Sequence, residues 1–152
     1  MTYKFNEDLA EHIQESGKNA EALVKDILEE GKYNFYKPKG YVGCKIDFVL
    51  EGYSPKTIGI EVKYQIDGQT AYEKVPHALY KYIFHHPKKL DEIWILLLGE
   101  GWNKILKSPS GQRILGHIEL LQNNTDVDII VIDSITKFQK KLQILKSILE
   151  AR

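Results

Sequence analysis

Apolar residues recur at helical spacing in four segments of the chain. This spacing gives a helix one apolar side, which packs on a core. It predicts one helix or two consecutive helices over residues 6–30, with a break at Ser16-Gly17, and further helices over 70–84, 111–122 and 134–151. Gly31 stands where a left-handed residue is expected to end the first helical region.

Strict alternation of apolar and other residues is clearest over 57–65. Ile58, Ile60, Val62 and Tyr64 occupy every second position, which is the period of a strand with one apolar face. Residues 45–50 also predict a strand, and 52–56 have the composition of a turn, so we expect an antiparallel hairpin. The continuous apolar runs 93–98 and 127–132 are typical of central strands covered on both sides.

The predicted order is helix, strand, strand, helix, strand, helix, strand, helix. This order indicates an α/β three-layer sandwich in which helices flank a central mixed β-sheet. A chain of 152 residues has the usual size of one domain, so we expect a single domain spanning 1–152.

The sequence also bears on location. The longest apolar run, 93–98, is far shorter than the roughly 20 residues that cross a bilayer. The N-terminal residues lack the apolar stretch of a signal peptide. Cys44 is the only cysteine, which excludes an internal disulfide and fits a reducing compartment. We therefore expect a cytoplasmic protein without a membrane partner.

Charge is balanced over the whole chain but not along it. The net charge is +0, with 21 basic and 21 acidic residues, yet residues 31–89 hold ten basic and five acidic ones. Local potential steers a polyanion more than net charge does. The middle of the chain is therefore compatible with a nucleic-acid partner.

The same segment contains the clearest candidate chemistry. Glu61 and Lys63 are two positions apart on the predicted strand, so they share a face, at about 7 Å from each other. Asp47 on the neighbouring strand can lie beside Glu61, and two carboxylates can bind a hard divalent cation. Metal ions and a nearby lysine supply what phosphodiester hydrolysis requires. Mg²⁺ suits such a site, and Mn²⁺ could replace it.

These residues resemble the active-site signature of the PD-(D/E)xK, or restriction-endonuclease-like, nuclease superfamily. Ile46-Asp47 is followed by Ile60-Glu61-Val62-Lys63, with Ile46 in place of the usual proline. The resemblance implies that the chain has the restriction-endonuclease-like fold. It also implies that the chain is a DNA endonuclease that leaves 5′-phosphates. It also implies metal binding by Asp47, Glu61 and the backbone carbonyl of Val62, with Lys63 as a catalytic residue.

Two segments that flank these residues resemble two different families within the superfamily. The run from Gly17 to Glu21 is similar to the first helix of archaeal Holliday-junction resolvases, which implies that Glu21 assists the metal site. Residues 68–76 are similar to the segment that follows the catalytic lysine in some restriction enzymes. We favour a restriction or repair nuclease over a resolvase. Cutting both strands then requires a homodimer or a partner subunit.

Each candidate has a plainer interpretation. Glu-x-Lys occurs on many exposed strands, and Glu21 fits a solvated helix position. Gln65, Glu73 and Lys74 are candidate DNA contacts, but Gln65 also fits an exposed strand position, and the other two fit a surface charge pair. A binding or assembly module that keeps the fold without turnover is the alternative from another functional class.

The histidines and one glycine-containing motif give weaker indications of function. His77, His85 and His86 lack the partners of a zinc site, so we interpret them as surface or DNA-facing residues. Gly99-Glu100-Gly101 is interpreted as a turn, because Lys104 stands where a dinucleotide-binding loop needs its third glycine.

Overall fold

The computed structural model describes residues 17–39, 45–53, 56–65, 74–86 and 89–150. Within these ranges a single mixed sheet has the strand order β1-β2-β3-β4-β5, which follows the order in the chain. The strands are β1 (Phe35–Tyr36), β2 (Phe48–Tyr53), β3 (Lys56–Tyr64), β4 (Glu92–Leu98) and β5 (Asp128–Ile132). The helices are α2 (Gly17–Glu30), α3 (Lys74–Phe84), α4 (Glu100–Leu106), α5 (Pro109–Asn123) and α6 (Ile135–Glu150).

The sheet combines an antiparallel half with a parallel half. Strands β1, β2 and β3 pair antiparallel, and Phe48 lies opposite Ile60. Strand β3 then pairs parallel with β4, with Glu61 opposite Ile95, and β4 pairs parallel with β5. The expected hairpin and mixed sheet are therefore confirmed.

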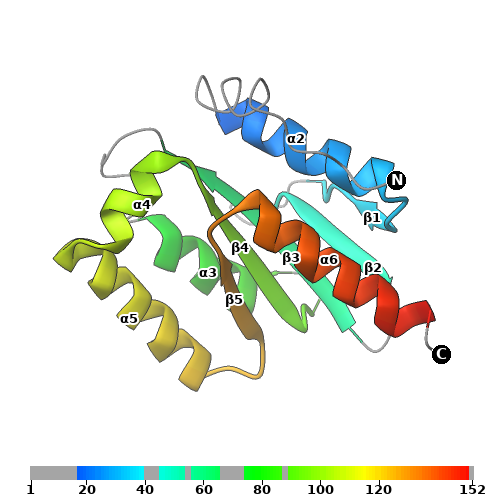
Figure 1. Cartoon of the computed structure of the whole chain (residues 1–152). Helices are drawn as coiled ribbons and strands as arrows, with labels where there is room; N and C mark the ends of the chain where they lie inside the picture. The colour runs from blue at the N-terminus through cyan, green and yellow to red at the C-terminus, as the bar shows by residue number, and fades with distance from the viewer. Residues whose placement is uncertain (1–16, 40–44, 54–55, 66–73, 87–88, 151–152) are drawn as a thin grey trace.

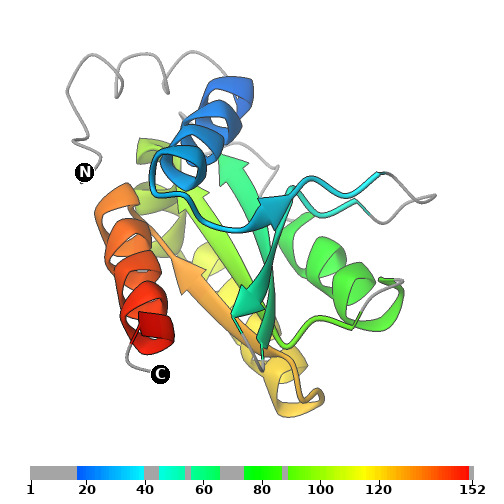
Figure 2. The same ribbon diagram turned by 90° about the vertical axis from the view of Figure 1, so that its right-hand side faces the viewer.

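Helices cover both faces of this sheet (Figure 1). Figure 2 shows α2 and α6 on one side of it and α3 on the other. The side chains divide in the same way. One core, here the α2–α6 core, contains Leu23, Val24, Phe48, Ile60, Trp94 and Phe138 with their neighbours. The other, the α3–α5 core, contains Val49, Leu79, Tyr82, Ile95, Trp102 and Ile114 with theirs.

The strand alternation explains this division. Ile58 and Ile60 point into the α2–α6 core, whereas Gly59 between them faces the other side. A Cβ on Gly59 would lie 2.5 Å from Ile46 and 2.9 Å from Leu90, which belong to the α3–α5 core. The side of β3 that carries Gly59 therefore faces the α3–α5 core.

Several expectations about the elements need correction. Strand β2 begins at Phe48 and runs to Tyr53, so Asp47 precedes the strand and the expected turn over 52–56 is partly strand. Strand β5 forms an edge of the sheet, with mixed exposure, because an apolar run alone does not fix a position in the sheet. The left-handed residue after α2 is Lys32, with a φ of 56°, and not Gly31.

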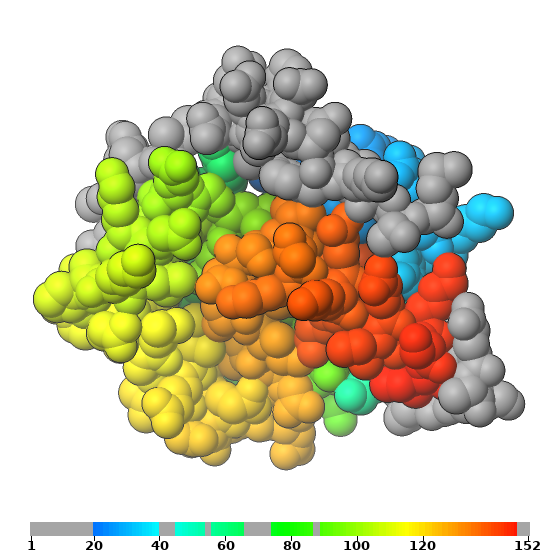
Figure 3. Space-filling view, viewed as in Figure 1, coloured from blue at the N-terminus to red at the C-terminus, as the bar shows by residue number. Residues whose placement is uncertain are grey.

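Two elements were not predicted. Strand β1 has two residues, and α4 begins at Glu100, where a turn was expected. Figure 3 shows α6 crossing one face of the molecule, beside α4 and α5. No helix of the described residues is long and apolar enough to span a bilayer.

Candidate active site

Glu61 is a charged residue at a buried position of β3. Its exposed fraction is 3%, because its side of the strand is covered by α3. The interpretation of Glu-x-Lys as a pattern on an exposed strand is therefore wrong for Glu61. Burying a carboxyl group is costly unless it is paired or protonated. The groups that contact the Glu61 carboxyl therefore decide whether it is charged and what it can bind.

Asp47 reaches Glu61 from the start of β2. Its Oδ2 accepts a hydrogen bond from the backbone N–H of Val62 at 2.8 Å. The ladder between β2 and β3 runs through the pair Phe48 and Ile60, and the Asp47 side chain continues it by one more bond. This bond holds Asp47 at the side of β3, next to Glu61.

The backbone carbonyl of Val62 lies on the same side of the strand. In a β-strand the N–H and C=O groups of one residue point toward the same neighbour. The N–H group of Val62 points to Asp47, so its carbonyl also faces the Asp47 side. Two carboxylates and one carbonyl oxygen therefore lie along this short stretch of backbone.

The surroundings of Glu61 strongly favour its protonated form. Burial raises the pKa of Glu61 to about 9, with further contributions from hydrogen bonding to Asp47 and from the charge of Asp47. Lys63 and the hydroxyl of Tyr82 act in the opposite direction and lower this pKa. The Nζ of Lys63 lies 3.8 Å from Oε2 of Glu61.

Tyr82 on α3 closes the site from the helix side. Its hydroxyl hydrogen-bonds with Oε2 of Glu61 and lies 3.1 Å from the carbonyl oxygen of Lys45. A hydroxyl has one hydrogen, so it donates to only one of them. Donation to Glu61 agrees with the lowering of the Glu61 pKa by this hydroxyl, and the proton of a protonated Glu61 then serves its hydrogen bond with Asp47. Sequence reasoning missed Tyr82, although it shares the buried stripe of α3 with Val75 and Leu79.

Lys63 differs from Glu61 in its access to solvent. The Lys63 side chain is 31% exposed, against 4% for the side chain of Glu61. The backbone carbonyl of Lys63 accepts a hydrogen bond from Nε1 of Trp102 at 3.1 Å. Helix α4, which was not predicted, therefore supports the strand that carries the lysine.

Gln65 also connects the end of β3 to the segment that begins α4. Its exposed fraction is 6%, so the interpretation of an exposed strand glutamine is wrong. Its backbone N–H donates to Leu98, and its carbonyl accepts from Gly101, both at 3.0 Å. Gly99 has a φ of 99°, and a Cβ there would lie 2.2 Å from the carbonyl oxygen of Gln65. A DNA contact of Gln65 stays a prediction.

Glu21 lies in the other helix layer and is paired there. Its carboxylate forms an ion pair with Lys37, whose Nζ lies 4.9 Å from the ring centre of Phe48. Phe48 belongs to the α2–α6 core, opposite the face of Glu61. In the described residues no group of three or more His, Cys, Asp or Glu side chains is arranged to hold a metal ion. A site role for Glu21 stays a prediction.

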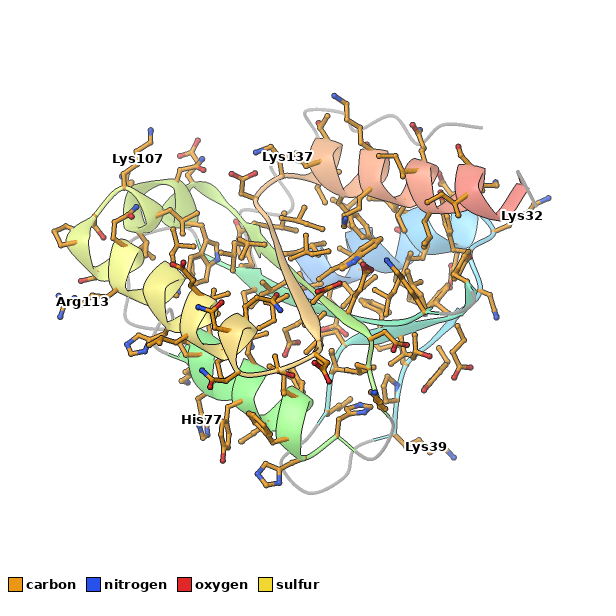
Figure 4. The ribbon with its side chains drawn as sticks, turned by 90° about the horizontal axis from the view of Figure 1, so that it is seen from below. Lys32, Lys39, His77, Lys107, Arg113 and Lys137 are labelled. Atoms are coloured by element: carbon orange, nitrogen blue, oxygen red, sulfur yellow. The ribbon has the colours of Figure 1, made fainter. Side chains whose placement is uncertain are left out.

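The remaining candidates are Glu73, Lys74 and the histidines. Glu73 lies outside the described residues, and Lys74 is the exposed first residue of α3. His77 and His85 are exposed. Figure 4 shows the His77 side chain leaving α3 on the side away from the sheet.

Asp47, Glu61 and Lys63 are thus brought together, with Tyr82 as an unexpected fourth member. Oxygen ligands from two carboxyl groups and one backbone carbonyl suit Mg²⁺, which retains several waters and needs few protein ligands. Comparison of the chain with protein-family models, with curated proteins and with solved structures finds no match.

Proposed function

We propose that this chain is a Mg²⁺-dependent DNA endonuclease of the PD-(D/E)xK type. The observation that carries the proposal is the convergence of two side chains of β3 with that of Asp47, which directly precedes β2. Asp47 is hydrogen-bonded to β3 beside Glu61, and Lys63 lies 3.8 Å from Glu61 on the same strand. These are the residue types that phosphodiester hydrolysis needs near one scissile phosphate.

Asp47, Glu61 and the carbonyl of Val62 would hold the metal ion. When bound, Mg²⁺ supplies positive charge to the phosphate and lowers the pKa of a water. A cation in place of the proton of Glu61 would offset the burial that raises its pKa, since the desolvated carboxylate would then face an opposite charge. The site is therefore compatible with a cation that binds in exchange for a proton.

Lys63 is the member of the site that a substrate can reach. Its ammonium group is partly exposed, whereas the Glu61 carboxyl beneath it is buried. A phosphate that approaches from solvent meets Lys63, which can bind a phosphate oxygen and orient the attacking water. Trp102 fixes the backbone at this position through its bond to the Lys63 carbonyl.

The finer assignment concerns the DNA that is cut. We propose a restriction or repair nuclease that leaves 5′-phosphates, working as a homodimer or with a partner subunit. A Holliday-junction resolvase is the alternative within the same class. In the resolvase-like reading Glu21 would assist the metal, but its carboxylate pairs with Lys37. This pairing favours the restriction or repair assignment.

One observation favours a non-catalytic module of the same fold. Glu61 has a pKa of about 9, and Tyr82 hydrogen-bonds with it, so a buried neutral pair without metal also accounts for the site. A module of this kind binds no divalent cation at Asp47. Thermal unfolding with and without Mg²⁺ or Mn²⁺ separates the two proposals, because a ligand that binds only the folded state raises the Tm.

The direct test is cleavage by the purified chain. Supercoiled plasmid and a synthetic four-way junction are incubated with Mg²⁺, Mn²⁺ or EDTA, and the product ends are assayed for 5′-phosphate. Metal-dependent cutting of the plasmid supports the restriction or repair assignment, and cutting confined to the junction supports the resolvase. Absence of both cleavage and metal binding would contradict a nuclease.

A further inference from the structure

The outer side of α3 carries a cluster of aromatic rings in contact with solvent. Tyr80 is 48% exposed and Phe84 is 51% exposed. The Tyr80 ring centre lies 4.9 Å from that of Phe84 and 5.7 Å from that of His85. We name the exposed residues His77, Tyr80, Phe84 and His85 the aromatic face of α3. Large exposed aromatic rings in contact with each other are a sign of a binding surface.

This face and the candidate active site share one helix. Val75, Leu79 and Tyr82 form the buried stripe of α3, and Tyr82 hydrogen-bonds with Glu61. At 100° per residue, Phe84 lies nearly opposite that stripe. The aromatic face is therefore separated from the site by one helix, and a strand that passes around a helix about 10–12 Å wide covers roughly 16–19 Å, or about five stacked nucleotides.

Charge identifies the kind of partner. The sequence from Lys74 to Leu90 contains no Asp or Glu, but it contains four lysines and three histidines. Lys74 and Lys89 are exposed. A partner for this surface should combine negative charge with flat apolar groups. A single-stranded nucleic acid has both, since its phosphates are anionic and every base has a face that stacks on aromatic rings.

We propose, building on the proposed function, that the aromatic face of α3 stacks unpaired bases of the DNA substrate close to the scissile phosphate. In a continuous duplex the base faces are covered by their neighbours, so Tyr80 and Phe84 can stack only where bases are unpaired. The substrate class is therefore DNA with a single-stranded stretch, such as a flap, a gap or a branch, which narrows the proposed function from a restriction or repair nuclease to a repair nuclease. Lys74 and Lys81, which are on the same helix, would hold the backbone of that strand.

The test is binding of fluorescent DNA to the full chain in EDTA, where no metal site contributes. Anisotropy is measured with a 20-nucleotide single strand, the matching duplex, and a duplex with a single-stranded flap. The variants are Tyr80→Ala, Phe84→Ala and the double variant. Tyr80→Phe keeps the ring, and Leu120→Ala removes a hydrophobic side chain that is 60% exposed on α5. Circular dichroism checks that each variant folds.

The proposal predicts tighter binding of the single strand and the flap than of the duplex. Each alanine variant should weaken single-strand binding by about tenfold and duplex binding much less. Tyr80→Phe and Leu120→Ala should bind as the parent chain does. Equal affinity for all three DNAs, or alanine variants that bind as the parent does, would overturn it.

Two further readouts separate this proposal from its alternatives. If the alanine variants change sedimentation of the chain alone and leave DNA binding intact, the aromatic face is a protein contact and the proposal is wrong. If the parent binds single strands through Tyr80 and Phe84 but cuts no DNA with Mg²⁺, the stacking surface stands and the nuclease does not. Failure of one proposal can therefore be distinguished from failure of the other.

Discussion

The Oδ2 atom of Asp47 accepts a hydrogen bond from the backbone N–H of Val62 at 2.8 Å. This bond extends the β2–β3 ladder beyond Phe48 and Ile60 by using a side chain. It gives Asp47 two roles, because the same carboxylate holds β3 in place and faces the carboxyl group of Glu61. The two roles can be separated by substitution.

Asp47→Asn and Asp47→Ala form a matched pair. The Asn side chain has an oxygen that can accept the Val62 hydrogen bond but lacks the charge, so stability should be retained while Mg²⁺ binding is lost. Asp47→Ala leaves the Val62 N–H without this partner and should cost about 1–3 kcal/mol of unfolding free energy. Urea unfolding and calorimetric Mg²⁺ titration measure the two effects. Equal stability of both variants would show that the bond is not structural.

The raised pKa of Glu61 predicts a pH-dependent stability. Between its ordinary pKa of 4.5 and its folded pKa of about 9, the unfolded chain binds fewer protons at this group than the folded chain. Unfolding free energy from Glu61 therefore falls as pH rises through this window. Glu61→Gln removes this effect, so in EDTA the variant should match the parent near pH 5 and exceed it increasingly up to pH 9. The slope of the difference is at most about 1.4 kcal/mol per pH unit. Parallel pH profiles would contradict the protonated carboxyl.

Tyr82→Phe tests the hydroxyl that contacts Glu61. This hydroxyl lowers the pKa of Glu61, so its removal raises that pKa further and makes deprotonation harder. Mg²⁺ affinity at pH 7 should fall by roughly tenfold and recover at higher pH. Tyr80→Phe, on the exposed side of the same helix, is the control and should leave Mg²⁺ affinity unchanged. An affinity loss that pH does not reverse would point to a general packing defect.

Gly99 and Gly116 provide a test of how α4 and β4 are joined. Gly99 has a φ of 99°, and an added Cβ would lie 2.2 Å from the Gln65 carbonyl oxygen, so Gly99→Ala should lose about 1–3 kcal/mol or more. A Cβ at Gly116, inside α5, meets nothing within 4 Å, so Gly116→Ala should gain up to about 1 kcal/mol. Thermal unfolding checks both. Similar Tm values for the two variants would contradict the close approach at Gly99.

The sequence predicted the face of Glu61 and Lys63 correctly because a strand has a fixed period of two. It could not show that α3 covers this face, because the docking of a helix depends on packing among distant residues. The burial of Glu61 and its contact with Tyr82 were therefore missed, although both set its pKa. Asp47 was expected within a strand, and it instead precedes β2 and bonds to the backbone of β3.

Whole helices and strands were also missed or misplaced by the sequence prediction, for a similar reason. Helix α4 has seven residues and contains Gly101, so its local signal is weak, and the burial of Trp102 and Ile105 stabilises it. The runs at β4 and β5 look alike in sequence, yet β4 is buried throughout and β5 lies at an edge. Only the neighbours of a strand decide whether it is central.

The most direct test of the proposed nuclease centre is the effect of Lys63→Ala on metal-dependent DNA cleavage. Lys107→Ala, which removes an exposed lysine at the end of α4, is the matched control. We predict that the parent chain and Lys107→Ala cut DNA with Mg²⁺, and that Lys63→Ala is slower by at least about 100-fold with an unchanged Tm. Cleavage by Lys63→Ala at the parent rate would contradict the account, since the reaction would then not depend on the site formed by Asp47, Glu61 and Lys63.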